Sequence, residues 1–335
     1  MDWEQAREAL VPEDGALFHR GRASRPVELP ELPAPVVDTH GHLLLLHKTD
    51  PAVALARAAL AGLRLLIVPL DPTDSRRAPL AALDELSRAQ EGAAELLERA
   101  AAEGVVPPEF GDAACGLSLP ESLRLVAGVH PYGSAQVDDA CLATLEQMLA
   151  DPRCVGVGEF GLDYGPYNEL PANVQEAAFR AQLRVAHEHG LPVQLHIRDA
   201  VDDPSAQAHR DAVRVLEQEG VPEAGVDLHC FTSGPEVLAP FVELGCHVAF
   251  GGAATFARSE DIRAAAVACP EELILSETDC PYMAPVPLRG QECEPAMTVF
   301  SAELLATTRA EAGVASREAT YQALWNNALD LFRIR

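Results

Sequence analysis

The sequence predicts an α/β fold, a (β/α)8 barrel of the TIM type, preceded by an N-terminal extension over residues 1–34. Eight short apolar segments alternate with Ala-, Leu- and Glu-rich helical segments, which indicates a parallel α/β architecture. The strand segments are apolar almost throughout, as in a sheet buried on both faces. A chain of 335 residues suits one such barrel, placed at 35–335. A doubly wound open sheet is the alternative, but no Gly-x-Gly-x-x-Gly follows the first strand.

The extension begins with a short helical pattern and ends in the Pro-rich stretch RPVELPELPAP. The expected strands then cover 36–40, 64–70, 123–130, 154–159, 192–196, 225–230, 247–250 and 273–277. The expected helices cover 51–61, 80–103, 137–150, 173–190, 204–219, 234–244, 258–268, 297–312 and 317–333. The segment 71–122 exceeds what one helix needs, because a Pro/Gly-rich loop follows its charged helical pattern. We interpret it as an elaborated connection between strands two and three, and as a candidate lid or partner surface.

Composition narrows the classes of protein and of partner. The formal net charge of −26 opposes long-range attraction of polyanions, although two divalent cations in a cleft would invert the local field. The eight cysteines form no CxxC pair or disulfide framework, which predicts free thiols in a reducing, cytoplasmic location. The N-terminus lacks the pattern of a secretory signal, and no run of about 18 apolar residues predicts a membrane span. No feature predicts an obligate protein partner.

Most of the predicted strands end in side chains that can bind metal. These are His40 and His42 after strand one, His130 after three, Glu159 after four, His196 after five, His229 after six and Asp279 after eight. The carboxyl ends of barrel strands meet at one mouth, where barrel enzymes have their active sites. His40 and His42 are two apart, so on a strand both would face the same side. Imidazole and carboxylate ligands suit Zn, Mn, Ni or Fe, and a pair of ions can activate water.

Six ordered blocks resemble the TatD-type metal-dependent hydrolases, a branch of the amidohydrolase-like barrels. The blocks are Val37-Asp38-Thr39-His40-Gly41-His42-Leu43, Gly128-Val129-His130-Pro131, Gly156 to Tyr164 (GVGEFGLDY), Leu191 to Arg198 (LPVQLHIR), His229-Cys230-Phe231, and Glu277 to Tyr282 (ETDCPY) with Arg289-Gly290 and Glu294-Pro295. Any single block would be weak evidence, but together they extend over most of the chain.

The resemblance implies two divalent metal ions, of Mg, Mn, Zn, Ni or Fe. It assigns His40, His42 and Asp279 to the first ion, His196 and His229 to the second, and Glu159 to the bridging position. Activated water would attack a phosphorus centre, which makes the chain a phosphodiesterase or deoxyribonuclease acting on DNA ends or a small phosphoester. Glu159, Asp279 and His130 are the expected catalytic residues, with Asp279 as a candidate proton acceptor. His130, Arg198 and Arg289 are candidate phosphate contacts.

The sequence departs from the family pattern beside these blocks. Gln291 and Glu292 replace two expected cations, Cys293 replaces an asparagine, and Thr232-Ser233-Gly234 and Tyr132 also differ from the usual residues. We therefore expect the groups that hold a polyanion to be fewer than usual. A hydrolase of a small carboxylic ester, lactone or amide on the same metals is one alternative, and a non-catalytic scaffold is another. Asp38 and Asp163 are candidates to orient a ligand imidazole, or to form purely structural hydrogen bonds.

Overall fold

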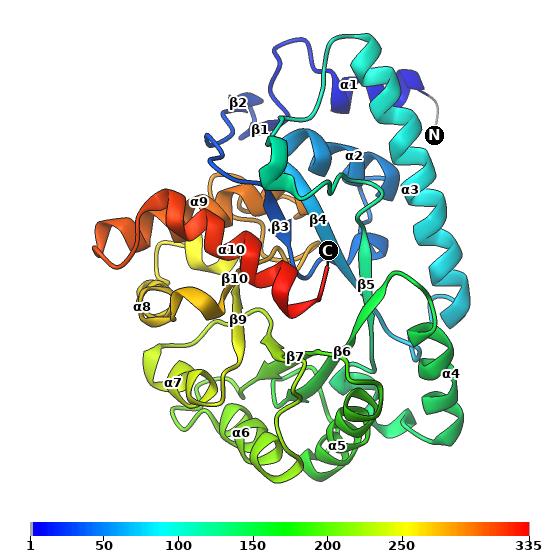
Figure 1. The fold of residues 1–335 in the computed structure, drawn as a ribbon, viewed down its shortest axis with the longest axis vertical. Helices are drawn as coiled ribbons and strands as arrows, with labels where there is room; N and C mark the ends of the chain where they lie inside the picture. The colour runs from blue at the N-terminus through cyan, green and yellow to red at the C-terminus, as the bar shows by residue number, and fades with distance from the viewer. Residues whose placement is uncertain (1–2, 335) are drawn as a thin grey trace.

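The computed structural model describes residues 3–334, and its core is a sheet of eight parallel strands in sequential order, β3 to β10 (Figure 1). The strands are β3 Val36–Asp38, β4 Leu63–Leu70, β5 Arg124–Ala127, β6 Cys154–Asp163, β7 Val193–Arg198, β8 Val226–Leu228, β9 His247–Phe250 and β10 Ile274–Ser276. The backbone N–H of Thr39 donates to the carbonyl of Ser276 at 3.1 Å, so the first and last strands meet and nearly close the barrel. The predicted barrel is confirmed.

Helices surround the strands on the outside, as Figure 1 shows. They are α2 Pro51–Ala61, α3 Pro79–Ala102, α4 Asp139–Leu149, α5 Ala172–His189, α6 Gln207–Glu219, α7 Pro235–Glu243, α8 Glu260–Ala268, α9 Thr298–Glu311 and α10 Arg317–Leu331. Each predicted helix is present, with ends that shift by no more than a few residues. Within residues 3–334, no helix is both long enough and apolar enough to cross a bilayer.

The strand ends differ more from the prediction than the helix ends do. Strand β3 stops at Asp38, β5 at Ala127 and β10 at Ser276, one to three residues before the ends predicted for them. Strand β6 instead continues to Asp163, so Glu159 lies inside it. The hydrophobic pattern of the sequence does not show where a paired strand ends and an extended loop begins, because both segments are extended and carry similar side chains.

The closed end of the barrel lies opposite the polar side chains. Trp325 of α10 and Phe332 just beyond the end of that helix share one apolar cluster with Val37, Leu65 and Leu275 of the strands. Figure 1 shows α10 crossing in front of the barrel. Since this end is filled with apolar side chains, a ligand would have to enter from the opposite end.

The 71–122 connection divides into three parts. Residues 71–77 follow β4 directly, α3 then packs along α2, and the remainder returns to the start of β4, where the guanidinium of Arg64 donates to the carbonyl of Pro108. The hydroxyl of Ser122 donates to the carbonyl of Arg64 at the same end. Residues 103–122 are therefore fixed at the end of β4 away from the polar residues. Of the connection, only residues 71–77 and the start of α3 line the cavity beside those residues.

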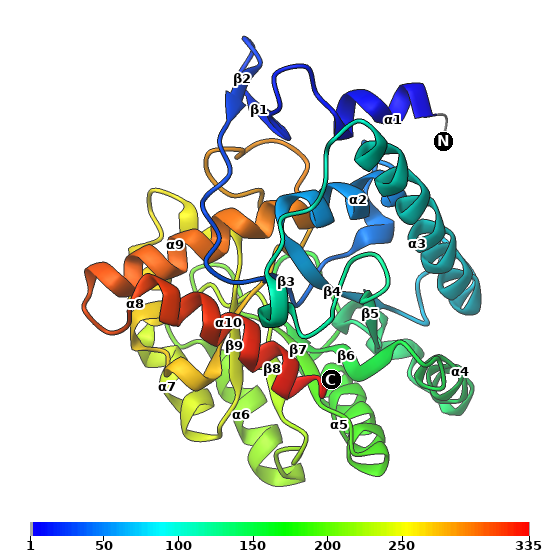
Figure 2. The same cartoon turned by 45° about the horizontal axis from the view of Figure 1, so that its top comes forward.

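The N-terminal extension packs on α2 and α3 (Figure 2). It contains α1 Trp3–Leu10 and a hairpin of β1 Phe18–Arg20 and β2 Arg25–Val27. The buried guanidinium of Arg57 donates to the carbonyls of Ala9 and Leu17 and to the carboxylate of Glu294. This side chain thus joins the extension to the barrel.

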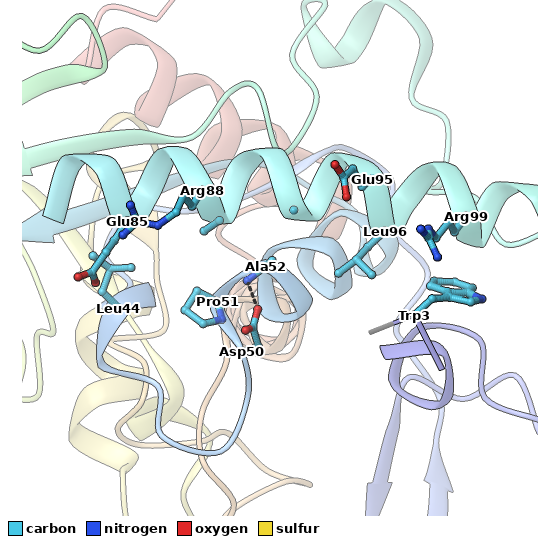
Figure 3. A pocket seen from close by; sticks show the side chains of 12 residues that line it. Trp3, Leu44, Asp50, Pro51, Ala52, Glu85, Arg88, Glu95, Leu96 and Arg99 are labelled. Carbon is cyan, nitrogen blue, oxygen red and sulfur yellow. Dashed lines mark hydrogen bonds between the residues drawn. The ribbon is translucent and has the colours of Figure 1, made fainter. Parts of the chain in front are cut away.

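A pocket of about 290 Å³ lies between α3, the start of α2 and Trp3 (Figure 3). Arg99 of α3 stands over the ring of Trp3, with 5.9 Å from its Cζ to the ring centroid. None of the predicted site residues lines this pocket.

Candidate active site

The structure brings the six predicted metal ligands together at the open mouth of the barrel. His40 and His42 come from the loop after β3, Glu159 from β6, His196 from β7, His229 from the end of β8 and Asp279 from the loop after β10. Three overlapping groups, His40–His42–Asp279, His40–Glu159–His229 and His130–Glu159–His196, each have ligand atoms within 4.8 Å of one another. Residues distributed over about 240 positions of sequence thus meet at one point.

Glu159 stands at the centre of the cluster. Its Oε1 atom lies 3.3 Å from Nε2 of His42 and 3.7 Å from Nε2 of His40. Its Oε2 atom lies 2.9 Å from Nε2 of His229 and 3.3 Å from Nδ1 of His196. One carboxylate therefore faces two pairs of imidazoles, one pair on each oxygen.

A bulge in β6 gives Glu159 this position. In the pairing with β7, Gly158 is opposite Gln194 and Phe160 is opposite Leu195, so Glu159 has no partner in the ladder. Bulges re-aim side chains and are common beside active sites. The neighbouring strand approaches closely here, since a Cβ on Gly128 would lie 2.7 Å from Cα of Gly158.

The two histidines of the HxH motif reach the same point without the strand geometry expected for them. Both follow the end of β3, so the two-residue alternation of a strand does not explain their shared direction. Their Nε2 atoms nevertheless lie 3.1 Å apart, and Oδ1 of Asp279 lies 3.5 Å from Nε2 of His42. Two backbone hydrogen bonds hold the loop after β3 against the loop after β10. The Asp279 N–H donates to the His40 carbonyl at 2.8 Å, and the His42 N–H donates to the Cys280 carbonyl at 2.9 Å.

The two aspartates expected to orient imidazoles have different roles. Asp163 Oδ2 lies 3.2 Å from Nε2 of His196, on the side of that ring away from Glu159. Asp38 makes no hydrogen bond to an imidazole ring among residues 3–334; it accepts hydrogen bonds from the N–H and hydroxyl of Thr278 at 2.9 and 2.6 Å and from the His40 N–H at 3.2 Å. Asp163 is thus placed to orient a ring, whereas Asp38 ties the loop after β3 to the loop after β10.

The charge state of the cluster follows from its geometry. Burial opposes ionisation of Glu159, but the imidazoles of His40 and His130, with the hydrogen-bonded rings of His196 and His229, hold the pKa of Glu159 well below its usual range. Burial, together with repulsion from His196, lowers the pKa of His130 to about 3. Glu159 is therefore a carboxylate and His130 a neutral imidazole at neutral pH.

His130 lies beside the cluster. Its ring centroid is 4.4 Å from that of His196, and its Nδ1 accepts the N–H of Tyr132 at 3.2 Å. A neutral ring that accepts at Nδ1 carries its proton on Nε2. His130 therefore offers one N–H donor at the mouth.

The mouth opens into a cavity of about 1060 Å³, whose walls include five of the six predicted ligands; His40 lies behind them, fully buried. Three cations line it: Arg76, Arg77 and Arg198. Arg76 and Arg77 are paired with Asp74 at 2.8 and 3.2 Å, whereas Arg198 has no ion-pair partner among residues 3–334 and lies over the ring of Tyr167. Three exposed tyrosines also border the cavity: Tyr132, Tyr167 and Tyr282.

Arg289 differs from the other candidate phosphate contacts because it does not line this cavity. Its guanidinium lies 4.2 Å from the ring centroid of Phe256, and the side chain is exposed. Gln291 and Glu292 also lie elsewhere: Gln291 donates to the carbonyl of His19, and Glu292 accepts backbone N–H groups of residues 47–49. Neither Gln291 nor Glu292 lines the cavity at the mouth.

Sequence reasoning missed several residues of the site. Arg76 and Arg77 belong to the 71–122 connection, but they follow β4 directly, and that position at the carboxyl end of a strand was the available signal. Gln194 and Asp227 lie fully buried inside apolar strands, behind the ligands. A polar residue within a buried strand was the signal in their case.

Comparison with known proteins is consistent with this geometry. A family model described as TatD related DNase matches residues 37–333. The uncharacterized metal-dependent hydrolase YabD of Bacillus subtilis is 30% identical over 245 residues, which cover 72% of this chain and 89% of the relative. YcfH of Escherichia coli K12, also an uncharacterized metal-dependent hydrolase, is 37% identical over 207 residues, or 62% and 72% of the two chains.

A third relative, from Edwardsiella piscicida, bears the name 3'-5' ssDNA/RNA exonuclease TatD. It is 33% identical over 222 residues, which cover 65% of this chain and 80% of the relative. Among solved structures, the TatD homolog YJJV of Escherichia coli K12 superposes with a TM-score of 0.66 at 24% identity, covering 91% of this chain and all of that one. The resemblance read from the sequence is thereby confirmed, and the chain belongs to the TatD-related DNase family of metal-dependent hydrolases.

Proposed function

We propose that this protein hydrolyses phosphodiester bonds, at the end of a nucleic-acid strand or in a small phosphoester, with two divalent metal ions at the barrel mouth. The observation that carries the proposal is the position of Glu159, whose two oxygens face different histidine pairs. In this position Glu159 would hold both ions of a two-metal site, with one oxygen toward each histidine pair. The name of the Edwardsiella relative supports the phosphodiester class.

The ligand assignment follows the contacts. His40, His42 and Asp279 would hold one ion, His196 and His229 the other, and Glu159 both. The donor set fits a metal because the Nε2 atoms of His40 and His42 lie only 3.1 Å apart and point at carboxylate oxygens. Imidazole and carboxylate together suit Zn, Mn, Ni or Fe, and Mg is the further candidate. When bound, two such ions would activate a water molecule and offset the negative charge that develops on the phosphoryl oxygens.

The remaining groups would bind and orient the substrate. The Nε2–H of His130 would donate to a phosphoryl oxygen, and the guanidinium of Arg198 matches a phosphate in a two-pronged arrangement. Asp279, which borders both the cluster and the cavity, would accept the proton of the attacking water. Arg289 lies outside the cavity and has no part in this proposal.

Two exposed tyrosines at the rim of the cavity, Tyr132 and Tyr282, favour a substrate that carries an unpaired base. The ring of Tyr132 stands edge-on to His130 at 4.4 Å between centroids, and the ring of Tyr282 stands edge-on to His42 at 6.4 Å. These tyrosines lie 48% and 54% exposed at the wall of the cavity. Exposed aromatic rings beside a phosphate site stack on the bases of single strands.

A substrate panel tests the reaction class. Metal-loaded protein would be assayed with bis(p-nitrophenyl) phosphate and single-stranded DNA, and in parallel with p-nitrophenyl acetate, a lactone and an amide, each with added Mg, Mn or Zn. We expect turnover of the phosphodiesters, and at least about a hundredfold loss in Glu159→Gln, because even an outer partner of a metal ligand is worth roughly 10–100-fold. Turnover confined to the carboxyl substrates would overturn the phosphodiester assignment and favour the ester, lactone or amide alternative.

A further inference from the structure

The ring of His40 is held from behind by a side chain that was not among the predicted site residues. The Oε1 atom of Gln194 lies 2.6 Å from Nδ1 of His40, and both residues are fully buried. The His229 ring stacks on His40 at 3.9 Å between centroids, yet its own Nδ1 has no hydrogen-bond partner among residues 3–334. Of the two stacked rings, His40 is therefore the one whose Nδ1 is held by a protein side chain.

The contacts of Gln194 determine which of its amide atoms faces the ring. Its Nε2 lies 2.8 Å from the carbonyl oxygen of Thr39 and 2.8 Å from Oδ2 of Asp227. A backbone carbonyl only accepts hydrogen bonds, so the amide nitrogen must lie on that side and the amide oxygen must face His40. Because this oxygen also only accepts, the proton of His40 must be on Nδ1. The lone pair of Nε2 then points into the site, toward His42 and Asp279.

Gln194 and Asp227 form a matched pair across two strands. They are directly opposite each other in the pairing of β7 with β8, so both side chains point to the same face. Asp227 is fully buried, and its Oδ1 has no hydrogen-bond partner among residues 3–334. A buried polar pair of this kind contributes little or nothing to stability compared with apolar residues of similar volume. Its presence inside the barrel therefore suggests a role other than stability.

We propose that Gln194, itself fixed by Asp227 and by the Thr39 carbonyl, is a positioning residue that holds His40 in the Nδ1–H tautomer and so sets the affinity of the His40–His42 metal position. This inference rests on the proposed function, since it takes His40 as a ligand. Hydrogen-bond partners behind a ligating histidine typically contribute 10–100-fold to metal affinity. We expect the effect to fall mainly on one of the two positions, because among residues 3–334 the only imidazole to which Gln194 hydrogen-bonds is that of His40.

The test uses the full-length double variant Gln194→Leu/Asp227→Val. The single Gln194→Leu change would leave Asp227 without its donor and is expected to destabilise the protein. The double change removes Asp227 together with its donor, so no buried carboxylate is left unpaired. The Thr39 carbonyl and the Nδ1–H of His40 still lose their partner, so we expect the metal-free variant to stay folded but to unfold at a lower temperature than the wild type. Calorimetric titration with Mn²⁺ should show about 10–100-fold weaker binding at one of two sites and an unchanged second site.

A second measurement reports the tautomer itself. Long-range ¹H–¹⁵N spectra of the metal-free wild type should show the His40 proton on Nδ1, and this signal should shift or disappear in the double variant. Asn327→Leu is the matched control. Its buried amide donates to the carbonyls of Glu271 and Ile274, at the opposite end of β10 from Asp279. We expect this control to lose stability while keeping both Mn²⁺ affinities.

The outcomes separate this inference from the proposed function. If the double variant bound Mn²⁺ as tightly as the wild type at both sites, or weakened both sites equally, the positioning role would be wrong and the two-metal site would stand. If the wild type bound no divalent metal, the proposed function would fail, and this inference with it.

Discussion

The backbone N–H of Lys48 donates to the carboxylate of Glu292, at 2.9 Å to Oε2 and 3.2 Å to Oε1. The N–H groups of His47 and Thr49 donate to the same carboxylate at 2.9 and 3.2 Å. One side chain thus ties the loop that carries His40 and His42 to the chain that follows Asp279. Partial burial opposes ionisation of Glu292, but the three N–H groups hold its pKa below the usual value.

Replacing Glu292 tests this tie. Glu292→Gln keeps one acceptor oxygen but turns an amide N–H toward the backbone donors, and we expect it to lower the free energy of unfolding by about 1 kcal/mol near pH 7. Because the pKa is lowered in the folded protein, the stabilisation is present above the normal pKa of glutamate and is lost as the pH falls through the folded value. Thermal unfolding between about pH 7 and pH 3 should show the two proteins converging in acid. A difference that grows in acid would contradict the assignment.

The N-terminal extension should depend on Arg57. Arg57→Met removes one partner of a buried ion pair with Glu294 and two donors to the carbonyls of the extension. Breaking such a pair costs about 3–5 kcal/mol. Limited proteolysis should then cut within residues 1–34 much faster than in the wild type. Arg99→Met, which removes only an exposed contact with Trp3, is the control and should leave the cleavage rate nearly unchanged.

Two arginines that looked equivalent in the sequence should behave differently. Arg198 lines the cavity and has no ion-pair partner among residues 3–334, whereas Arg289 lies outside it on Phe256. We expect Arg198→Met to raise KM for a phosphodiester about tenfold, the loss of one charge-assisted contact of about 1.5 kcal/mol, and Arg289→Met to leave KM within about twofold. Steady-state kinetics with bis(p-nitrophenyl) phosphate measures both. An equal effect of the two changes would contradict the placement of the phosphate site.

The rim tyrosines should matter for bases and not for the reaction itself. Tyr132→Leu and Tyr282→Leu are each expected to lower kcat/KM for single-stranded DNA by about tenfold, since stacking of one base on an aromatic ring is worth about 1–3 kcal/mol. Methyl p-nitrophenyl phosphate, which has no base to stack, should be hydrolysed at nearly the wild-type rate. Tyr164→Phe serves as the control because Tyr164 does not line the cavity. Equal losses on both substrates would indicate a structural role.

The fold and the convergence of the candidate ligands were accessible from the sequence for one physical reason. Strands of a parallel barrel are buried on both faces and point the same way, so apolar segments that end in His, Glu or Asp place those side chains at one mouth. The prediction that these side chains meet at one mouth did not depend on correct strand ends. His40, His130 and Asp279 lie in loops that continue the direction of their strands.

The details that escaped depend on contacts between distant segments. The bulge at Glu159 appears only when β6 is paired with β7. The contacts of Glu292 involve a loop more than 240 residues away in the sequence, so they could not be read from the residues beside it. Gln194 and Asp227 occupy opposite positions on neighbouring strands, a relationship that local pattern does not contain.

The central claim is a two-metal site bridged by Glu159, and metal stoichiometry tests it most directly. The wild type and Glu159→Ala would be loaded with Mn²⁺ or Zn²⁺, freed of excess ion and analysed for metal by mass spectrometry, with unfolding curves to verify that both are folded. The account predicts about two ions per chain in the wild type. It predicts fewer in the folded variant, together with loss of phosphodiester turnover. Two tightly held ions and unchanged turnover in Glu159→Ala would contradict it.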